Sequence, residues 1–86
     1  MQKDSDIQLM LSFKRGDAGA FRELYDKHKN RVIQYCFRFC GNRALAEDMA
    51  QETFLRVIRG AGRYEPMARF STWLFTIASN HLIDHW

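Results

Sequence analysis

The sequence lacks the features that mark exported, membrane-spanning and nucleotide-hydrolysing proteins. Its first residues, MQKDSDIQLML, do not place a basic segment before a long apolar run, so we do not expect a signal peptide. No apolar run reaches the ~18 residues that a membrane-spanning helix needs. There is also no glycine-rich phosphate loop, no nucleophile beside a base and no inward pair of carboxylates. We therefore expect neither an enzyme nor a bound cofactor.

Cysteine and proline are scarce, with two cysteines and one proline in 86 residues. Together with the missing export signal, this favours free thiols in a reducing cytoplasm. Cys36 and Cys40 are four residues apart, as are His81 and His85, so a zinc site is an alternative. Structural zinc sites usually place paired cysteines closer together, and the geometry of a helix suits a disulfide at this spacing poorly. The pattern favours core packing over metal binding.

Acidic residues are absent from one stretch of the chain. The whole sequence has 13 basic and 10 acidic side chains, a net charge of +3. Residues 27–43 contain five basic side chains and no acid, and residues 56–69 contain only Glu65 as an acid. This uneven distribution indicates an anionic partner such as nucleic acid more clearly than the net charge does.

Apolar residues recur with a helical period of about 3.6 along nearly the whole chain. The spacing predicts helices over residues 6–14, 18–40 and 44–59, and a fourth helix after Ser71. Asp6 and Ser71 are candidate N-caps of the first and fourth helices. Phe39 and Ile58 are expected to face inward on their helices. We expect a single all-α domain, a compact bundle of about four helices.

The third expected helix carries an acidic face opposite its apolar stripe. Asp48, Gln51, Glu52 and Leu55 fall at i, i+3, i+4 and i+7, and therefore lie on one side. A solvated face with a pair between Glu52 and Arg56 is the ordinary explanation for such charges. An exposed leucine bordered by acids and an amide also fits a docking patch for a basic protein.

A second candidate surface follows in RYEPMARFSTW and the helix after it. Arginines interleaved with aromatic residues suit single-stranded DNA, whose bases stack on side chains while cations hold its backbone. Phe70 and Trp73 have the spacing of core residues, whereas Tyr64, Met67 and Ala68 are harder to assign to the core. The outward face of the last helix carries small polar and apolar residues that allow close approach to DNA: Thr72, Thr76, Ser79, Asn80 and Ile83.

These motifs resemble a known family. AEDMAQETFLRVIR is similar to the helix with which bacterial sigma factors of the extracytoplasmic-function group dock on core RNA polymerase. FSTWLFTIASNHLID resembles the promoter-reading helix of that group, and GDAGAFRELYDKHKNRVIQYCFRFCGN resembles the start of the same domain, called region 2. The resemblance covers nearly the whole chain, with the motifs in the expected order. It implies that residues 1–86 form region 2, and we expect region 4, the family's second DNA-binding domain, to be absent from this chain.

The resemblance also implies partners for both surfaces. Asp48, Gln51, Glu52, Leu55 and Arg56 would contact the clamp helices of the polymerase β′ subunit, while Phe54 and Val57 would stay structural. The loop would capture a flipped base of the single-stranded non-template strand of the minus-ten element. The DNA-binding residues would come from the loop and the last helix: Arg63, Tyr64, Met67, Ala68, Arg69, Thr72, Thr76, Ser79, Asn80 and Ile83.

Two departures and two alternatives accompany this hypothesis. Many relatives have Arg or Lys where this chain has Ser79, and they continue past Trp86 with basic residues, so we expect weaker phosphate contact here. Members of the family are commonly held inactive by an anti-sigma factor, which makes such a protein a further candidate partner. A helical protein-interaction module without a DNA role is the main alternative, and zinc binding is the lesser one.

Overall fold

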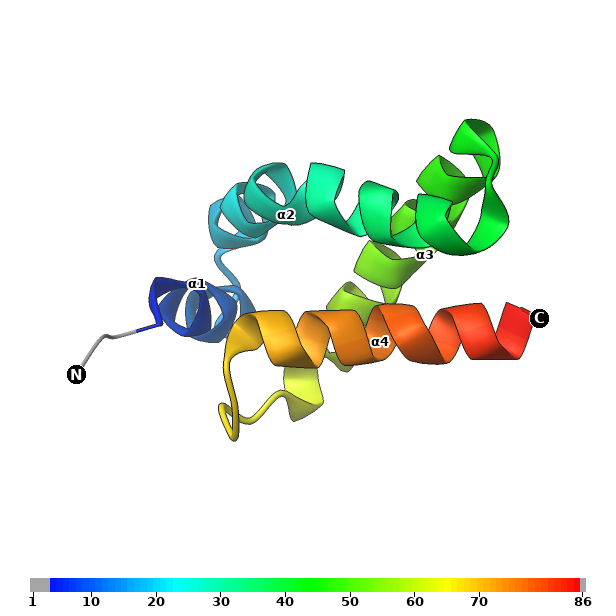
Figure 1. The fold of residues 1–86 in the computed structure, drawn as a ribbon. Coiled ribbons are helices and arrows are strands. Elements are labelled where there is room, and N and C mark those ends of the chain that lie inside the picture. The colour runs from blue at the N-terminus through cyan, green and yellow to red at the C-terminus, as the bar shows by residue number, and fades with distance from the viewer. Residues whose placement is uncertain (1–3, 86) are drawn as a thin grey trace.

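The chain forms helices connected by short loops. A computed structural model describes residues 4–85, with side chains described for residues 4–83. The helices are α1 (Ser5–Lys14), α2 (Ala18–Cys40), α3 (Arg43–Gly60) and α4 (Phe70–His85), with a short 3₁₀ turn, η1 (Ala61–Arg63), after α3 (Figure 1). The described part of the chain contains no strand. The predicted all-α bundle of about four helices is confirmed.

Local sequence signals explain where α2 and α3 begin and end. Asp17 caps α2, because its Oδ1 accepts hydrogen bonds from the backbone N–H groups of Gly19 and Ala20. Gly41 ends the helix in the left-handed conformation, with φ of 66°, which costs glycine little. Asn42 then caps α3 by accepting from the N–H of Leu45. The tight Gly-Asn connection therefore turns the chain directly from α2 into α3.

Two predicted caps are wrong. Asp4, not Asp6, caps α1, since Asp4 Oδ1 accepts from the Asp6 N–H at 3.0 Å. Asp6 is instead buried and bonded to α2. The fourth helix begins at Phe70, one residue before the expected cap Ser71, which is thus the second residue of α4. In both cases a polar side chain in the first turn resembled a cap that another residue provides.

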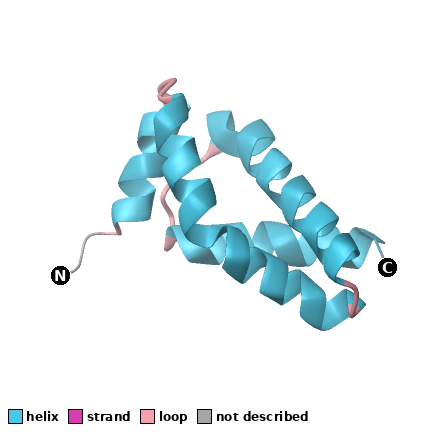
Figure 2. Cartoon of the chain, turned by 90° about the horizontal axis from the view of Figure 1, so that it is seen from above, coloured by secondary structure: helices cyan, strands magenta, loops and turns pink. Residues whose placement is uncertain are grey.

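The core lies where α2, α3 and α4 meet. Figures 1 and 2 show α2 and α3 joined at a sharp turn, with α4 running beside them. α1 packs against the first half of α2, where its Asp6 meets Lys27 and His28. The largest side chains with almost no exposure come from all four helices and from the segment before α4: Tyr64, Phe70, Met10, Leu24, Met49, Leu74, Val32 and Val57.

The core differs from the predicted stripes at the helix ends. Phe39 and Ile58 were expected inside but are 55% and 43% exposed. Ile33, by contrast, is buried against α3 although it lies beside the predicted stripe of α2. Ile58 is exposed because it lies three residues after the exposed Leu55, beside the buried stripe of α3 rather than within it. Phe39 faces an open hollow between α2 and α4. No helix in the described part of the chain is both long and apolar enough to span a membrane.

Candidate functional site

The acidic face of α3 is exposed, as the sequence predicts. Asp48, Gln51 and Leu55 are exposed, and Glu52 and Arg56 are partly buried. The exposed fraction of Leu55 is 44%, whereas Phe54 and Val57 on the opposite side are buried. The periodicity therefore separates the structural residues of α3 from its surface residues correctly.

Most charges on this face are paired within α3 itself. Glu52 Oε1 lies 3.1 Å from Arg59 Nη1 and 3.7 Å from Arg56 Nε, which confirms the predicted pair at i+4. Glu47 accepts from Arg43 at 3.0 Å. Asp48 has no ion-pair partner among the described residues. These exposed pairs contribute little to stability and exchange easily for a stronger partner.

The incorrectly predicted Ile58 extends this face. Asp48, Gln51, Leu55 and Ile58 follow one another at intervals of three and four residues along the helix. Leu55 and Ile58 are both more than 40% exposed, so they form an apolar strip beside the acidic groups. The spacing of three residues between them is the sequence signal that could have assigned Ile58 to this surface.

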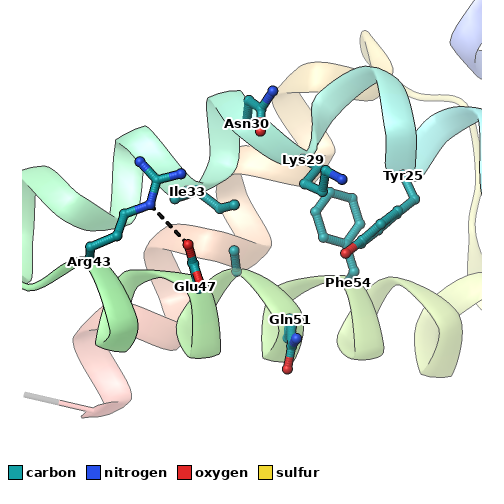
Figure 3. Close-up of a pocket in the computed structure, with 9 residues that line it drawn as sticks. Tyr25, Lys29, Asn30, Ile33, Arg43, Glu47, Gln51 and Phe54 are labelled. Carbon is teal, nitrogen blue, oxygen red and sulfur yellow. Dashed lines mark hydrogen bonds and ion pairs between the residues drawn. The ribbon is translucent and has the colours of Figure 1, made fainter.

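A shallow hollow of about 280 Å³ lies between α2 and α3 next to the acidic face. Figure 3 shows Tyr25 and Phe54 at one end and the Arg43–Glu47 pair at the other. Ile33 and Ala50 line the apolar wall, and Gln51 belongs both to this hollow and to the acidic face. The hollow gives the α3 surface a place for a partner's side chain to insert.

The loop before α4 is exposed except at its two ends. Residues 65–69 are all exposed, and Met67 is 87% exposed. Tyr64 is only 2% exposed, and its ring lies 4.9 Å from the ring of Trp73. Burial, together with the charge of Asp4, raises the pKa of Tyr64. The sequence left Tyr64 without a core assignment, but its ring is buried against Phe70 and Trp73 and cannot stack on a base in this conformation.

The outward face of α4 contains an exposed row of polar side chains. Thr72, Thr76 and Asn80 are exposed and four residues apart. The Thr76 hydroxyl donates to the backbone oxygen of Thr72 at 2.7 Å, which leaves oxygen lone pairs outside. Ser79 is partly buried at the edge of this face, where its hydroxyl shares a hydrogen bond with the Tyr35 hydroxyl. Asn80 thus adds an exposed side-chain amide to the two threonines of this row.

Both ends of the predicted DNA surface are also exposed. Arg63, Ala68 and Arg69 are exposed, and Ile83 is 72% exposed. Residues 66–83 contain two basic groups if His81 is counted and no acid. A polyanion approaching residues 66–83 therefore meets no carboxylate from this segment, whereas Glu65 is exposed at the start of the loop.

The cysteine and histidine pairs do not come together as a metal site in the described residues. Cys36 is buried, and this burial, with Cys40 nearby, raises the pKa of its thiol to about 11. Cys40 donates to the backbone oxygen of Asn42 at 3.3 Å. The side chain of His85 lies outside the described residues. Among the described residues, no three His, Cys, Asp or Glu side chains form a cluster that could hold a metal ion.

Comparison with known proteins gives a consistent assignment. Residues 24–86 match the model of the sigma-70 region 2 family. The chain is 51% identical over 75 residues to RNA polymerase sigma factor CarQ of Myxococcus xanthus. The aligned residues cover 87% of this chain and 43% of CarQ. It is 42% identical over 71 residues to the ECF RNA polymerase sigma factor SigW of Bacillus subtilis, which covers 83% of this chain and 38% of SigW.

The chain therefore belongs to the sigma-70 region 2 family, as a region 2 domain of the extracytoplasmic-function type. The predicted family is confirmed, and so is the prediction that the chain is not an enzyme, since its relatives are sigma factors. The chain spans less than half of the length of the relatives described above.

Proposed function

We propose that this domain recruits core RNA polymerase to promoters. α3 binds the clamp helices of the β′ subunit, and the loop of residues 64–69 with α4 binds the single-stranded non-template strand of the minus-ten element. The observation that carries the proposal is the separation of two exposed surfaces of different chemistry, one acidic and apolar on α3, the other on the loop and residues 70–83 of α4, where Glu65 is the single acid. This recruitment would take place in the cytoplasm, where core RNA polymerase acts.

The α3 surface has the groups that a basic coiled coil needs. Asp48 has no ion-pair partner among the described residues, and Glu52 already holds two arginines at ion-pair distance, so both can accept charge-assisted hydrogen bonds. Gln51 offers an amide beside them, and Leu55 with Ile58 supplies apolar area that a partner helix would cover. Arg56 would hold Glu52 in position for the partner.

The loop and α4 have the groups that an unpaired strand needs. Flipping a base out of the duplex costs a few kcal/mol, and binding the flipped base captures the melted state without ATP. Met67, Ala68 and Arg69 are exposed on the loop, and the exposed Asn80 can bond a base edge or a phosphate. Because Tyr64 is buried, the stacking partner would be the exposed Met67 rather than a tyrosine ring.

The proposal predicts that both partners bind at once. The experiment first selects single-stranded oligonucleotides from a random pool with core polymerase that carries the 86-residue chain. It then measures whether the selected strand and a β′ clamp-helix coiled coil bind the isolated chain together. A ternary complex supports the proposal. Competition between the two ligands would contradict it. If the chain binds polymerase but no strand is selected, the domain is a protein-interaction module without a DNA role.

A further inference from the structure

The loop of residues 64–69 is bonded at its two ends to Lys14 of α1 and to Asp4, the N-cap of α1, which are far away in sequence. Lys14 Nζ donates to the backbone oxygen of Tyr64 at 3.0 Å. Asp4 Oδ2 accepts from the backbone N–H of Phe70 at 2.9 Å. These contacts join residues that are 50 and 66 positions apart, and they fall where the loop begins and ends. Figure 1 shows α1 beside the point where the loop enters α4.

The Asp4 carboxylate stabilises two helix N-termini at once. Its Oδ1 accepts from the Asp6 N–H in the first turn of α1, and its Oδ2 accepts from the first N–H of α4. Free N–H groups and the helix dipole both favour an anion at these positions. One side chain therefore fixes where α4 starts relative to α1.

α1 is itself firmly attached to the bundle. Asp6 Oδ1 lies 2.8 Å from Lys27 Nζ, and Asp6 Oδ2 lies 2.9 Å from His28 Nε2. Burial alone raises the pKa of Asp6, but the hydrogen bonds and charges of Lys27 and His28 outweigh it and lower the pKa overall. The His28 ring also packs at 5.6 Å from the Phe70 ring, so the Asp6 anchor lies directly behind the start of α4.

The loop has few bonds of its own. Between Tyr64 and Phe70 one backbone hydrogen bond is internal to the loop, from the Met67 N–H to the Glu65 oxygen. The loop residues between the two bonded ends are exposed and pack on little. The conformation of the loop therefore depends on where its ends are held, and a loop that is held in advance pays less ordering entropy when it binds.

We propose that α1 is a clamp that holds the loop in its DNA-reading conformation, with Asp4 and Lys14 as positioning residues that bind no DNA themselves. α1 lies outside residues 24–86, the part of the chain that matches the family model. The inference rests on the proposed DNA-reading function. It adds that the contacts from α1 determine how well the loop distinguishes one single strand from another.

The test compares paired variants of the 86-residue chain. Lys14→Met removes the bond to Tyr64. Arg15→Met is its control, because it removes the same charge from the next residue, the C-cap of α1, whose side chain contacts Ser12 rather than the loop. Asp4→Ala removes both caps, and Asp17→Ala is its control, because Asp17 caps α2 without touching the loop. Lys14→Arg can still reach the carbonyl and should restore function.

Two measurements separate the clamp from general stability. The first is amide hydrogen exchange at Phe70, which should become about tenfold faster in Asp4→Ala than in Asp17→Ala when both are compared under native conditions. The second is the affinity for the selected single strand relative to a scrambled strand. We expect this ratio to fall about fivefold in Lys14→Met and Asp4→Ala, and to stay at the wild-type value in both controls and in Lys14→Arg.

The outcomes are distinguishable. Suppose that wild type binds the selected strand and that Lys14→Met and Asp4→Ala keep the wild-type ratio of affinities for the selected and scrambled strands. Then α1 does not act as a clamp on the loop, and the proposed function stands. If the ratio falls equally in the controls, the effect is one of charge or stability, and the clamp is again wrong. If wild type shows no preference for any strand, the proposed function itself fails, and the reading role of the clamp fails with it.

Discussion

The two candidate surfaces of this domain are built in different ways. On the acidic face of α3, the ion pairs among the described residues join side chains of that helix four or seven positions apart. The loop before α4 is organised from a distance, by Asp4 and Lys14 on α1. A surface of the first kind survives changes elsewhere in the bundle, whereas a surface of the second kind depends on how the bundle is packed.

This difference suits the two proposed tasks. A coiled coil is a rigid partner with a regular repeat, and one straight helix face matches it without adjustment. A flipped base needs a pocket with a defined shape, and a short exposed loop keeps that shape only when its ends are fixed.

The largest effect is expected from removing the buried ring that supports the loop. Tyr64→Ala should lower the free energy of unfolding by about 3–5 kcal/mol, because it leaves a cavity beside Phe70 and Trp73. Tyr64→Phe should change it by less than ~1 kcal/mol, since the Tyr64 hydroxyl is buried without a hydrogen-bond partner among the described residues. Urea unfolding measures both values. A large loss of single-strand affinity in Tyr64→Phe would show that the hydroxyl reads DNA after all.

The next effect concerns the α3 face alone. Asp48→Arg combined with Glu52→Arg should weaken binding to core polymerase by about a hundredfold, because reversed charges would face the basic clamp helices. Single-strand binding and the melting temperature should hardly change. Glu23→Arg with Asp26→Arg on α2 is the control, with the same change of charge on another exposed surface. Equal loss in both double variants would mean that net charge, not the α3 face, governs docking.

A smaller effect is expected on the α4 face. Asn80→Ala should weaken binding to the selected single strand about tenfold, as the loss of one amide contact to a base would. Polymerase binding should stay unchanged. Gln8→Ala, which removes an exposed amide from α1, provides the comparison in the same fluorescence anisotropy assay. Wild-type affinity in Asn80→Ala would remove Asn80 from the DNA surface.

The smallest effect is the pH dependence of the α1 anchor. The lowered pKa of Asp6 means that its ionised form stabilises the fold above the ordinary value of 3.8 and that this contribution disappears as the pH falls through the lowered value. Asp6→Asn should therefore cost about 1 kcal/mol at pH 6, the value being reduced because Lys27 is half-exposed. Stability curves of the two proteins should converge below pH 3.8. A constant gap down to pH 2 would show that ionisation of Asp6 plays no part.

The same contrast explains how far the sequence alone could predict the structure. Helices α2 and α3, with the exposed Leu55 and the pair of Glu52 with Arg56, follow from a period that repeats along one helix. The cap of α1 required a choice between Asp4 and Asp6, and only the packing of α1 on α4 decides that Asp4 serves two helices. The burial of Tyr64 could not be predicted, because nothing local in RYEPMAR indicates that its ring packs on α4 while α1 bonds its backbone oxygen.

The central claim is that α3 meets polymerase and the loop meets DNA in the same complex. Its most direct test places a photoreactive amino acid at Leu55 or at Met67, both of which are exposed, and irradiates the chain on core polymerase with promoter DNA. We predict crosslinks from Leu55 to the β′ subunit and from Met67 to the non-template strand. Crosslinks from Met67 to β′, or from Leu55 to DNA, would contradict this assignment of the two surfaces.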